Sequence, residues 1–173
     1  GGGFSYTKNG WRKEPFAARH TFTAITAFAT GSFQFKYTGD YTDVLGKWDL
    51  NTSALWQEPF FVNNFFGVGN DTEFLMDQFV APDDDPIDYY RTRMDRLDLD
   101  VGLSRNVGAK AKFYFGGGYK SIQVENTANR FISDQSTDAA DFDPNRYVRF
   151  FTGISFDSRD NKVLPKAGMT AKA

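Results

Sequence analysis

The stretch FFTGISFDSRDNKVLPKAG, residues 150–168, decides the fold of this chain. Its first half alternates with a period of two, which is typical of a β-strand whose faces meet different environments. One set of alternating side chains is Phe150, Thr152, Ile154 and Phe156. A polar segment follows, in which Pro165 cannot donate to a strand ladder and Gly168 gives the backbone the freedom of a turn. The stretch therefore predicts a strand, a polar reversal and a second strand that starts near Met169.

The composition of the 173 residues combines many large apolar side chains with a polar average. Aromatic residues make up 17%, with 19 Phe and 8 Tyr, yet the mean hydropathy is −0.50. A soluble domain hides such residues in a core, whereas a transmembrane barrel spreads them over its outer surface around a polar lumen. Together with the strand pattern, this balance favours the barrel.

Charge and cysteine content exclude several classes of protein. There are 20 basic and 22 acidic residues, a net charge of −2, so no electrostatic footprint for nucleic acid is present. The chain has no cysteine, which excludes a disulfide framework and cysteine metal sites. No apolar run reaches the roughly 18 residues that a membrane-spanning helix needs. Any membrane contact is therefore expected through strands.

The other strands repeat the two-faced pattern. A short segment at residues 4–8 looks like the end of a strand, and Glu14-Pro15 is expected to delay the next one. Further strands are predicted at residues 19–29, 31–42, 48–57, 89–104, 110–124 and from 148 to 156. In the strand at 31–42 the aromatic residues share one face and the polar residues share the other. Trp48 and Trp56 lie at the two ends of an apolar stripe, which is about 27 Å long at the rise of a strand. This length suits an interfacial aromatic belt. Two tryptophans in the core of a β-sandwich would give the same sequence pattern.

The charged residues of the strand at 89–104 support a wet interior on the polar side. Asp98 and Asp100 share that side with Arg96, as in a salt-bridged lumen wall. Arg91, Arg93 and Asp95 continue the apolar face, and their clustering at one end of the strand predicts that they lie beyond the hydrocarbon.

The lengths of the connections alternate along the chain. Short ones are predicted near residues 43–47, 106–108 and 160–167, long ones at 58–88 and 126–145, and one unusually tight outer hairpin near Thr30-Gly31. Short turns and long loops then fall on opposite edges of the sheet, as in outer-membrane barrels.

Residue patterns that could carry chemistry have simpler interpretations. The acidic run Asp83-Asp84-Asp85 could suggest calcium, but no partner ligands follow at a suitable spacing, and we interpret it as a solvated loop. The run Gly116-Gly117-Gly118 fits no phosphate-binding fingerprint and is typical of curvature and close approach in a barrel wall. His20 is the single histidine, and we interpret it as a surface residue. We predict no catalytic residues, no metal site and no cofactor in this chain.

Three motifs resemble one known family. The pattern Phe156-Asp157-x-Arg159-Asp160-Asn161, with Pro165 and Gly168, resembles a periplasmic turn of the bacterial surface antigen superfamily, the BamA-like and TamA-like outer-membrane assembly and translocation barrels. The loop NFFGVGNDT, residues 64–72, is similar to a segment found in many of these barrels; its motif positions are Asn64, Gly67, Gly69 and Asn70. The segment GWRKEPF, residues 10–16, ahead of His20 resembles the subgroup fused to a metallophosphoesterase-like domain.

The resemblance implies an all-β, antiparallel transmembrane barrel in the outer membrane of a Gram-negative cell. It implies roughly 16 strands in the whole barrel, of which about eight lie here, so residues 1–173 are expected to be an internal part of one barrel domain. It further implies a role in inserting or translocating other proteins, with outer-membrane lipid, client proteins and accessory lipoproteins as partners. The lipid-facing and girdle residues are expected to be Phe33, Phe35, Tyr37, Trp48, Trp56, Leu97, Leu99, Val101, Phe113, Phe115, Phe150, Ile154 and Phe156.

Two alternatives remain from the residues alone. A small, complete outer-membrane barrel with a structural or adhesive role would need a signal sequence and an aromatic C-terminus. A soluble β-sandwich that binds a ligand would bury the Phe33, Phe35 and Tyr37 face between two sheets. The missing aromatic terminus argues against the small barrel, and the alternating loop lengths argue against the sandwich.

Overall fold

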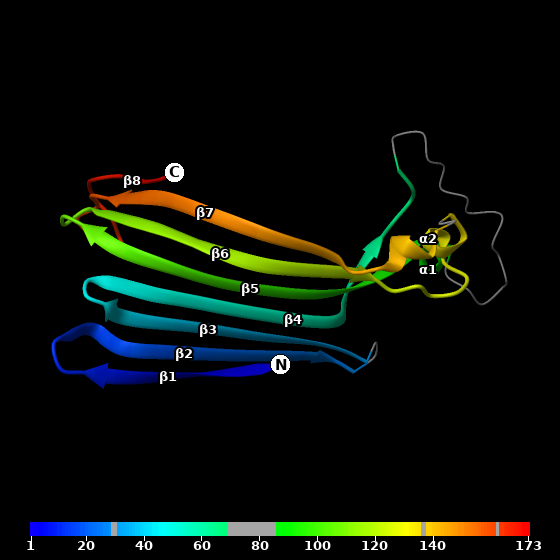
Figure 1. Cartoon of the computed structure of the whole chain (residues 1–173), viewed down its shortest axis with the longest axis horizontal. Coiled ribbons are helices and arrows are strands. Elements are labelled where there is room, and N and C mark those ends of the chain that lie inside the picture. Colours follow the sequence, from blue (N-terminus) through cyan, green and yellow to red (C-terminus); the bar gives the residue numbers. More distant parts are fainter. Residues whose placement is uncertain (29–30, 69–85, 136–137, 162) are drawn as a thin grey trace.

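The chain forms one antiparallel sheet of eight strands (Figure 1). The computed structural model describes residues 1–28, 31–68, 86–135, 138–161 and 163–173. Each strand pairs with its neighbours in sequence, in the order β1 to β8. The strands are β1 Gly2–Gly10, β2 Lys13–Ala27, β3 Ser32–Leu45, β4 Trp48–Asn64, β5 Arg91–Val107, β6 Ala111–Val124, β7 Asn145–Asp157 and β8 Thr170–Lys172.

The sheet is open and single-layered. No pairing joins β1 to β8 among the described residues, so the eight strands form part of a barrel wall and not a closed barrel. There is no second sheet stacked on the first in that part of the chain, which removes the β-sandwich alternative. The predicted all-β, antiparallel, partial barrel is confirmed.

The connections alternate between the two ends of the sheet (Figure 1). The turns β1–β2, β3–β4, β5–β6 and β7–β8 lie at one end, which we call the short-turn end. The connections β2–β3, β4–β5 and β6–β7 lie at the other, the long-loop end, and these last two contain α1 (Pro86–Tyr90), α2 (Phe131–Gln135) and a 3-10 helix (Ala139–Phe142). Gly31, at the short outer hairpin, has a φ of 64°, which suits its turn.

The start of β2 differs from the prediction. The strand begins at Lys13 and not at Arg19, and it includes Glu14-Pro15, whose peptide bond is cis. The ladder between β1 and β2 shifts register between Lys8 and Gly10, which pair with Ala18 and Lys13 respectively. Pro15 lies inside this irregular stretch, so its missing N–H removes no regular ladder bond.

The end of β4 and the start of β5 also differ from the prediction. Strand β4 continues to Asn64, although a loop was expected from Glu58. A register shift between Gln57 and Phe61 absorbs Pro59, after which pairing with β5 resumes and ends at Asn64 opposite Arg91. Tyr89 and Tyr90, predicted to be strand, belong to α1. The predicted acidic run at residues 83–85 lies outside the described residues.

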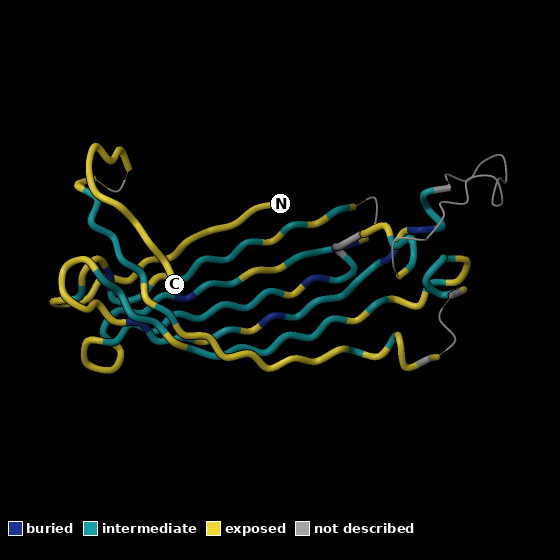
Figure 2. Tube along the Cα trace, turned by 90° about the horizontal axis from the view of Figure 1, so that it is seen from above, coloured by how far each residue is buried: buried dark blue, intermediate teal, exposed yellow. Residues whose placement is uncertain are grey.

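The described part of the chain has almost no apolar core (Figure 2). Its only buried hydrophobic residues are Phe16 and Tyr90. No helix within the described ranges is long and apolar enough to cross a bilayer. The apolar side chains of this sheet are therefore not covered by a core within the described part of the chain.

Candidate functional site

One face of the sheet, which we call the apolar face, carries the residues predicted to meet lipid. Paired residues of an antiparallel ladder point to the same side, so the register defines each face. One row across the sheet joins Phe4, Phe22, Tyr37, Ala54, Leu99, Tyr119 and Val148. The neighbouring rows place all thirteen predicted residues on this side: Phe33, Phe35, Tyr37, Trp48, Trp56, Leu97, Leu99, Val101, Phe113, Phe115, Phe150, Ile154 and Phe156.

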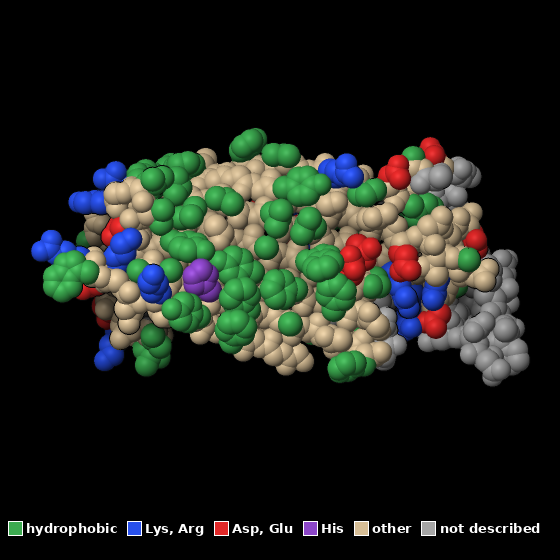
Figure 3. Space-filling model, turned by 60° about the horizontal axis from the view of Figure 1, so that its bottom comes forward, with side chains coloured by type: hydrophobic (Ala, Val, Ile, Leu, Met, Phe, Trp, Pro, Cys, Tyr) green, Lys and Arg blue, Asp and Glu red, His purple; other side chains and the backbone are tan. Residues whose placement is uncertain are grey.

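The apolar face is exposed (Figure 3). Val101 is 54% exposed and Phe150 is 87% exposed, and Phe35, Trp56, Leu99, Phe115 and Ile154 are exposed as well. Aromatic rings pack side by side along it: the centroids of Phe22 and Tyr37 are 4.9 Å apart. That this face meets lipid stays a prediction, because its surroundings lie outside the chain.

The opposite face, which we call the polar face, holds the shielded polar side chains. The five buried polar residues in the described part of the chain all lie on it: Ser32, Gln57, Thr92, Asp98 and Ser104. Side-chain hydrogen bonds join neighbouring strands. Asn51 Nδ2 donates to Asp40 Oδ1 at 2.7 Å, and Ser104 Oγ donates to Asn51 Oδ1 at 3.0 Å. These hydrogen bonds satisfy polar groups of Asp40, Asn51 and Ser104. One side-chain oxygen each of Gln57, Thr92 and Asp98 is buried without a hydrogen-bond partner among the described residues.

One glycine of β6 lets side chains of the neighbouring strands meet across it. Asp100 on β5 pairs with Gly118, which pairs with Arg149 on β7. Arg149 Nη2 lies 2.6 Å from both carboxylate oxygens of Asp100, and Ser53 Oγ donates to the same carboxylate at 3.3 Å. A Cβ on Gly118 would lie 2.1 Å from Asp100 Oδ1, so only glycine leaves room for this ion pair. The interpretation of the glycine run as a site of close approach is confirmed at Gly118.

A second row places an aromatic ring over glycines on the polar face. Phe151 follows Gly116 and Gly102 in the ladder. A Cβ on Gly116 would lie 2.5 Å from Phe151 Cζ, and one on Gly102 would lie 3.3 Å from the same atom. Phe151 therefore covers bare backbone on the polar face.

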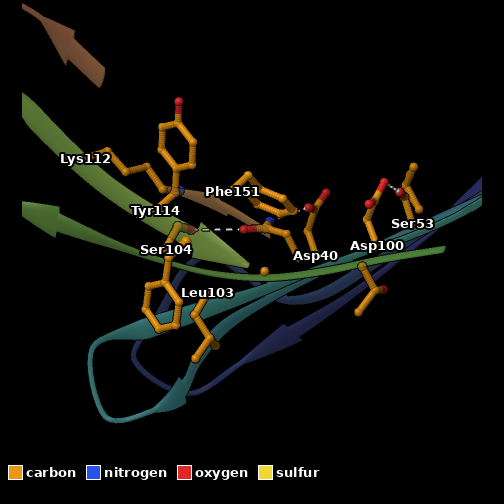
Figure 4. A pocket seen from close by; sticks show the side chains of 13 residues that line it. Asp40, Ser53, Asp100, Leu103, Ser104, Lys112, Tyr114 and Phe151 are labelled. Atoms are coloured by element: carbon orange, nitrogen blue, oxygen red, sulfur yellow. Dashed lines mark hydrogen bonds between the residues drawn. The ribbon is translucent and has the colours of Figure 1, made fainter. Parts of the chain in front are cut away.

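These rows border an open hollow of about 490 Å³ on the polar face (Figure 4). Asp40, Asp100, Tyr114 and Phe151 stand on one side of the strands, while Leu103 points to the other. Lys112 also lines the hollow, and its Nζ lies 3.6 Å from Asp49 Oδ2. The hollow is lined by both signs of charge and suits water and polar chain segments.

The predicted family turn, residues 157–168, is held by its own polar side chains. Arg159 donates from Nε to Asp157 Oδ1 and from Nη2 to Asp157 Oδ2, both at 2.9 Å. Asp160 Oδ1 accepts from the backbone N–H groups of Asn161, Lys166 and Ala167 at 2.9 to 3.1 Å. These contacts make the turn a structural unit, and they explain its charged residues without acid/base chemistry.

Further motif residues of the turn serve the same reversal. Asn161 Oδ1 accepts from the N–H groups of Val163 and Leu164 at 2.8 and 3.1 Å. Pro165 follows and has no N–H to leave unpaired. Gly168 has a φ of 98°, and a Cβ there would lie 2.4 Å from Ser158 O. Only glycine fits this position.

The electrostatics of the turn follow from these hydrogen bonds. The backbone N–H groups of Ala167 and Lys166 lower the pKa of Asp160. The hydrogen bond to Asp157 raises the pKa of Arg159. Both charged forms are therefore favoured in the folded turn.

The predicted loop motif enters an aromatic cluster at the long-loop end. Asn64 pairs with Arg91, and the N–H of Phe65 donates to Tyr90 O at 2.8 Å. The ring of Tyr90, which is 1% exposed, lies 4.9 Å from that of Phe66 and 5.1 Å from that of Phe131. Gly67 has a φ of 109°, whereas the predicted motif residues Gly69 and Asn70 lie outside the described residues.

The same cluster joins the two long connections. Tyr89 Oη donates to Asp134 Oδ2 at 3.0 Å, which ties α1 to α2. Burial, with this hydrogen bond, raises the pKa of Tyr89 to about 12. The aromatic pairing of α1 with α2 was missed from the sequence because the two segments are far apart in the chain, and because Tyr89 and Tyr90 were predicted to begin a strand.

His20 differs from a simple surface residue. It lies half-buried on the apolar face, where its Nδ1 is 3.0 Å from Tyr37 Oη, and that hydroxyl is 3.0 Å from Tyr41 Oη. Within the described ranges, no group of three or more histidine or acidic side chains is placed to hold a metal ion.

Comparison with known proteins identifies the family. The model of the Omp85 superfamily domain matches residues 3–173. Neither the curated proteins nor the solved structures contain a match to this chain. Proteins of this superfamily are outer-membrane β-barrel proteins related to BamA, and they are generally not enzymes. The fusion to a metallophosphoesterase-like domain stays a prediction. The match covers nearly the whole chain, and the chain therefore belongs to the Omp85 superfamily.

Proposed function

We propose that this sheet is part of the wall of an outer-membrane barrel that inserts or translocates other proteins in a Gram-negative cell. On this proposal the apolar face contacts the hydrocarbon of the outer membrane and the polar face lines a wet lumen. Client proteins and accessory lipoproteins are the partners that the assembly and translocation superfamily suggests. For this segment we predict no catalytic role.

The observation that supports the proposal is that apolar side chains are exposed on one face while polar side chains are buried on the other. Val101, in the middle of β5, is 54% exposed, while Asp98 on the same strand is 6% exposed. Burying a charged group while exposing apolar area is unfavourable in water. The same arrangement is favourable in a bilayer, where lipid covers the apolar face and the lumen hydrates the polar one.

An assembly assay with the native polypeptide tests the proposed role. The protein is reconstituted into vesicles of outer-membrane lipid, and an unfolded client barrel is added from urea. We expect the client to reach its heat-resistant, protease-protected form faster than in vesicles that contain an equal amount of an unrelated barrel.

Depletion in the source organism distinguishes the alternatives. The proposal predicts that folded outer-membrane proteins decline while this protein is depleted and that their unfolded forms accumulate in the periplasm. Normal levels of folded outer-membrane proteins, with a loss of cell adhesion or envelope strength, would instead support a structural barrel.

A further inference from the structure

A hollow of about 510 Å³ lies at the short-turn end of the apolar face. Its lining residues are Trp48, Arg105, Asn106, Val107, Gly108 and Phe113. Arg105 pairs with Phe113 in the ladder between β5 and β6, so both point to the apolar side. The Arg105 guanidinium carbon lies 5.8 Å from the centre of a Trp48 ring.

Arg105 differs from two ion-paired arginines of the polar face. Arg96 and Arg149 are paired with Asp98 and Asp100 on the polar face. Arg105 is exposed on the apolar face, and no carboxylate lies within ion-pair distance of it in the part of the chain that the structure describes. Its guanidinium keeps planar donors for an anion that comes from outside the sheet.

The surroundings of Arg105 combine an apolar floor with positive charge. The rings of Trp48 and Phe115 are 5.4 Å apart, and those of Trp48 and Phe113 are 6.3 Å apart, which forms a continuous aromatic surface beside the guanidinium. Lys47 and Lys110 are exposed in the turns β3–β4 and β5–β6. Basic side chains gather at the short-turn end of this view of the molecule (Figure 3).

We propose that this hollow binds the headgroup of an anionic phospholipid, with Arg105 on the phosphodiester and the acyl chains along Trp48 and Phe113. The charge of the three cations is complementary to such a headgroup, and guanidinium matches the geometry of phosphate oxygens. Tryptophan marks the level at which headgroups meet hydrocarbon. The inference rests on the proposed function, because it requires that the apolar face lies in a bilayer.

The chain offers a close control for Arg105. Arg93 lies on the same face of the same strand, toward the long-loop end, where it pairs with Val62. Replacement of either arginine by Gln removes one positive charge from the apolar face. Only Arg105→Gln removes it from the aromatic hollow.

The test measures which lipids stay bound to the native polypeptide. The protein is taken from nanodiscs of equal parts phosphatidylglycerol and phosphatidylcholine, and native mass spectrometry counts the retained lipids. We expect the preference for phosphatidylglycerol to fall about fivefold in Arg105→Gln, the effect of one cation near an anionic surface. Arg93→Gln should retain the preference of the unmodified protein.

Several results would overturn the site. An equal loss of preference in both variants would indicate a general charge effect, and no loss in either would exclude Arg105 as a headgroup ligand. Displacement of phosphatidylglycerol by millimolar inorganic phosphate would show that the site binds soluble anions without a contribution from the acyl chains.

A second readout separates this proposal from the proposed function. A bimane fluorophore on Ala54→Cys, in the middle of the apolar face, is placed in vesicles with brominated acyl chains. Quenching without a phosphatidylglycerol preference would overturn only the headgroup site. Absence of quenching would overturn the lipid-facing assignment and the headgroup site with it.

Discussion

Gly168 shows how a single residue fixes the reversal between β7 and β8. Its φ of 98° is unfavourable for other residues, and any Cβ would collide with Ser158 O. Gly46, in the β3–β4 turn, also has a positive φ of 65°, but in the described part of the chain no atom beyond its chain neighbours lies within 4 Å of the position its Cβ would take.

Replacement of these two glycines by alanine separates the two effects. We expect Gly46→Ala to lower the free energy of unfolding by about 1 kcal/mol, through backbone strain alone. Gly168→Ala should cost roughly 2 to 3 kcal/mol, because it adds the steric collision. Urea unfolding of the native polypeptide in detergent measures both. Equal losses would contradict the close packing of the turn.

Asp160 gives the same turn a dependence on pH. Its pKa is lowered in the folded state by the N–H groups of Ala167 and Lys166. A lowered pKa means that the stabilisation is complete above the unfolded value of about 4 and is lost as the pH falls through the folded value. We therefore expect amide hydrogen exchange at Lys166 and Ala167 to accelerate below about pH 4, beyond the intrinsic rate. Asp160→Asn should remove this acid-dependent step, and an unchanged step would show that another group causes it.

At the level of the element, strand β6 acts as a bridge between its neighbours. Gly118 allows the Asp100–Arg149 ion pair to cross it on the polar face, and Gly117 lies on the apolar face, where a Cβ would meet its nearest atom at 3.4 Å. Adjacent glycines in one strand thus face different constraints.

Alanine at these two positions tests the bridge. Gly118→Ala should separate Asp100 from Arg149 and lower the free energy of unfolding by roughly 1 to 3 kcal/mol, through overpacking. Gly117→Ala should change it by less than about 0.5 kcal/mol, as ordinary contact implies. Denaturant midpoints of the two variants give the comparison. A larger loss for Gly117→Ala would contradict the assignment of the two faces.

The strands also show what a sequence pattern can and cannot predict. Alternation correctly grouped Phe33, Tyr37 and Leu97 on one face, because the period of a strand is a local property. The pairing of Asp100 with Arg149 depends on register between distant segments, which alternation does not contain. The extent of β4 was missed because a bulge between Gln57 and Phe61 accommodates Pro59, which in a regular central strand would end pairing.

The candidate site was predictable to a similar degree. The motif turn was located correctly, since Asp157, Arg159, Asp160 and Gly168 act on one another within a few residues. The hollow on the polar face needed side chains from five strands, β3 to β7, and no local signal gathers them.

The central feature of the whole molecule is that the exposed face of its sheet is apolar, whereas a soluble protein exposes a polar face. Large apolar side chains lie exposed on one face, and hydrogen-bonded polar side chains are shielded on the other. The short-turn end is rich in Lys and Arg, while the long-loop end carries an aromatic cluster around Tyr90. These features suit a barrel wall with different surroundings at its two ends.

The most direct measurement compares two adjacent residues of β4 in vesicles. Ser53 pairs with Asp100 on the polar face, and Ala54 pairs with Leu99 on the apolar face. The chain contains no cysteine, so each can be replaced by Cys in the native polypeptide once any cysteines elsewhere have been removed. We predict that brominated lipids quench a bimane at position 54 and not at 53, while a charged maleimide labels position 53 faster than 54. The reverse pattern, or equal labelling without quenching, would contradict the lipid-facing assignment of the apolar face.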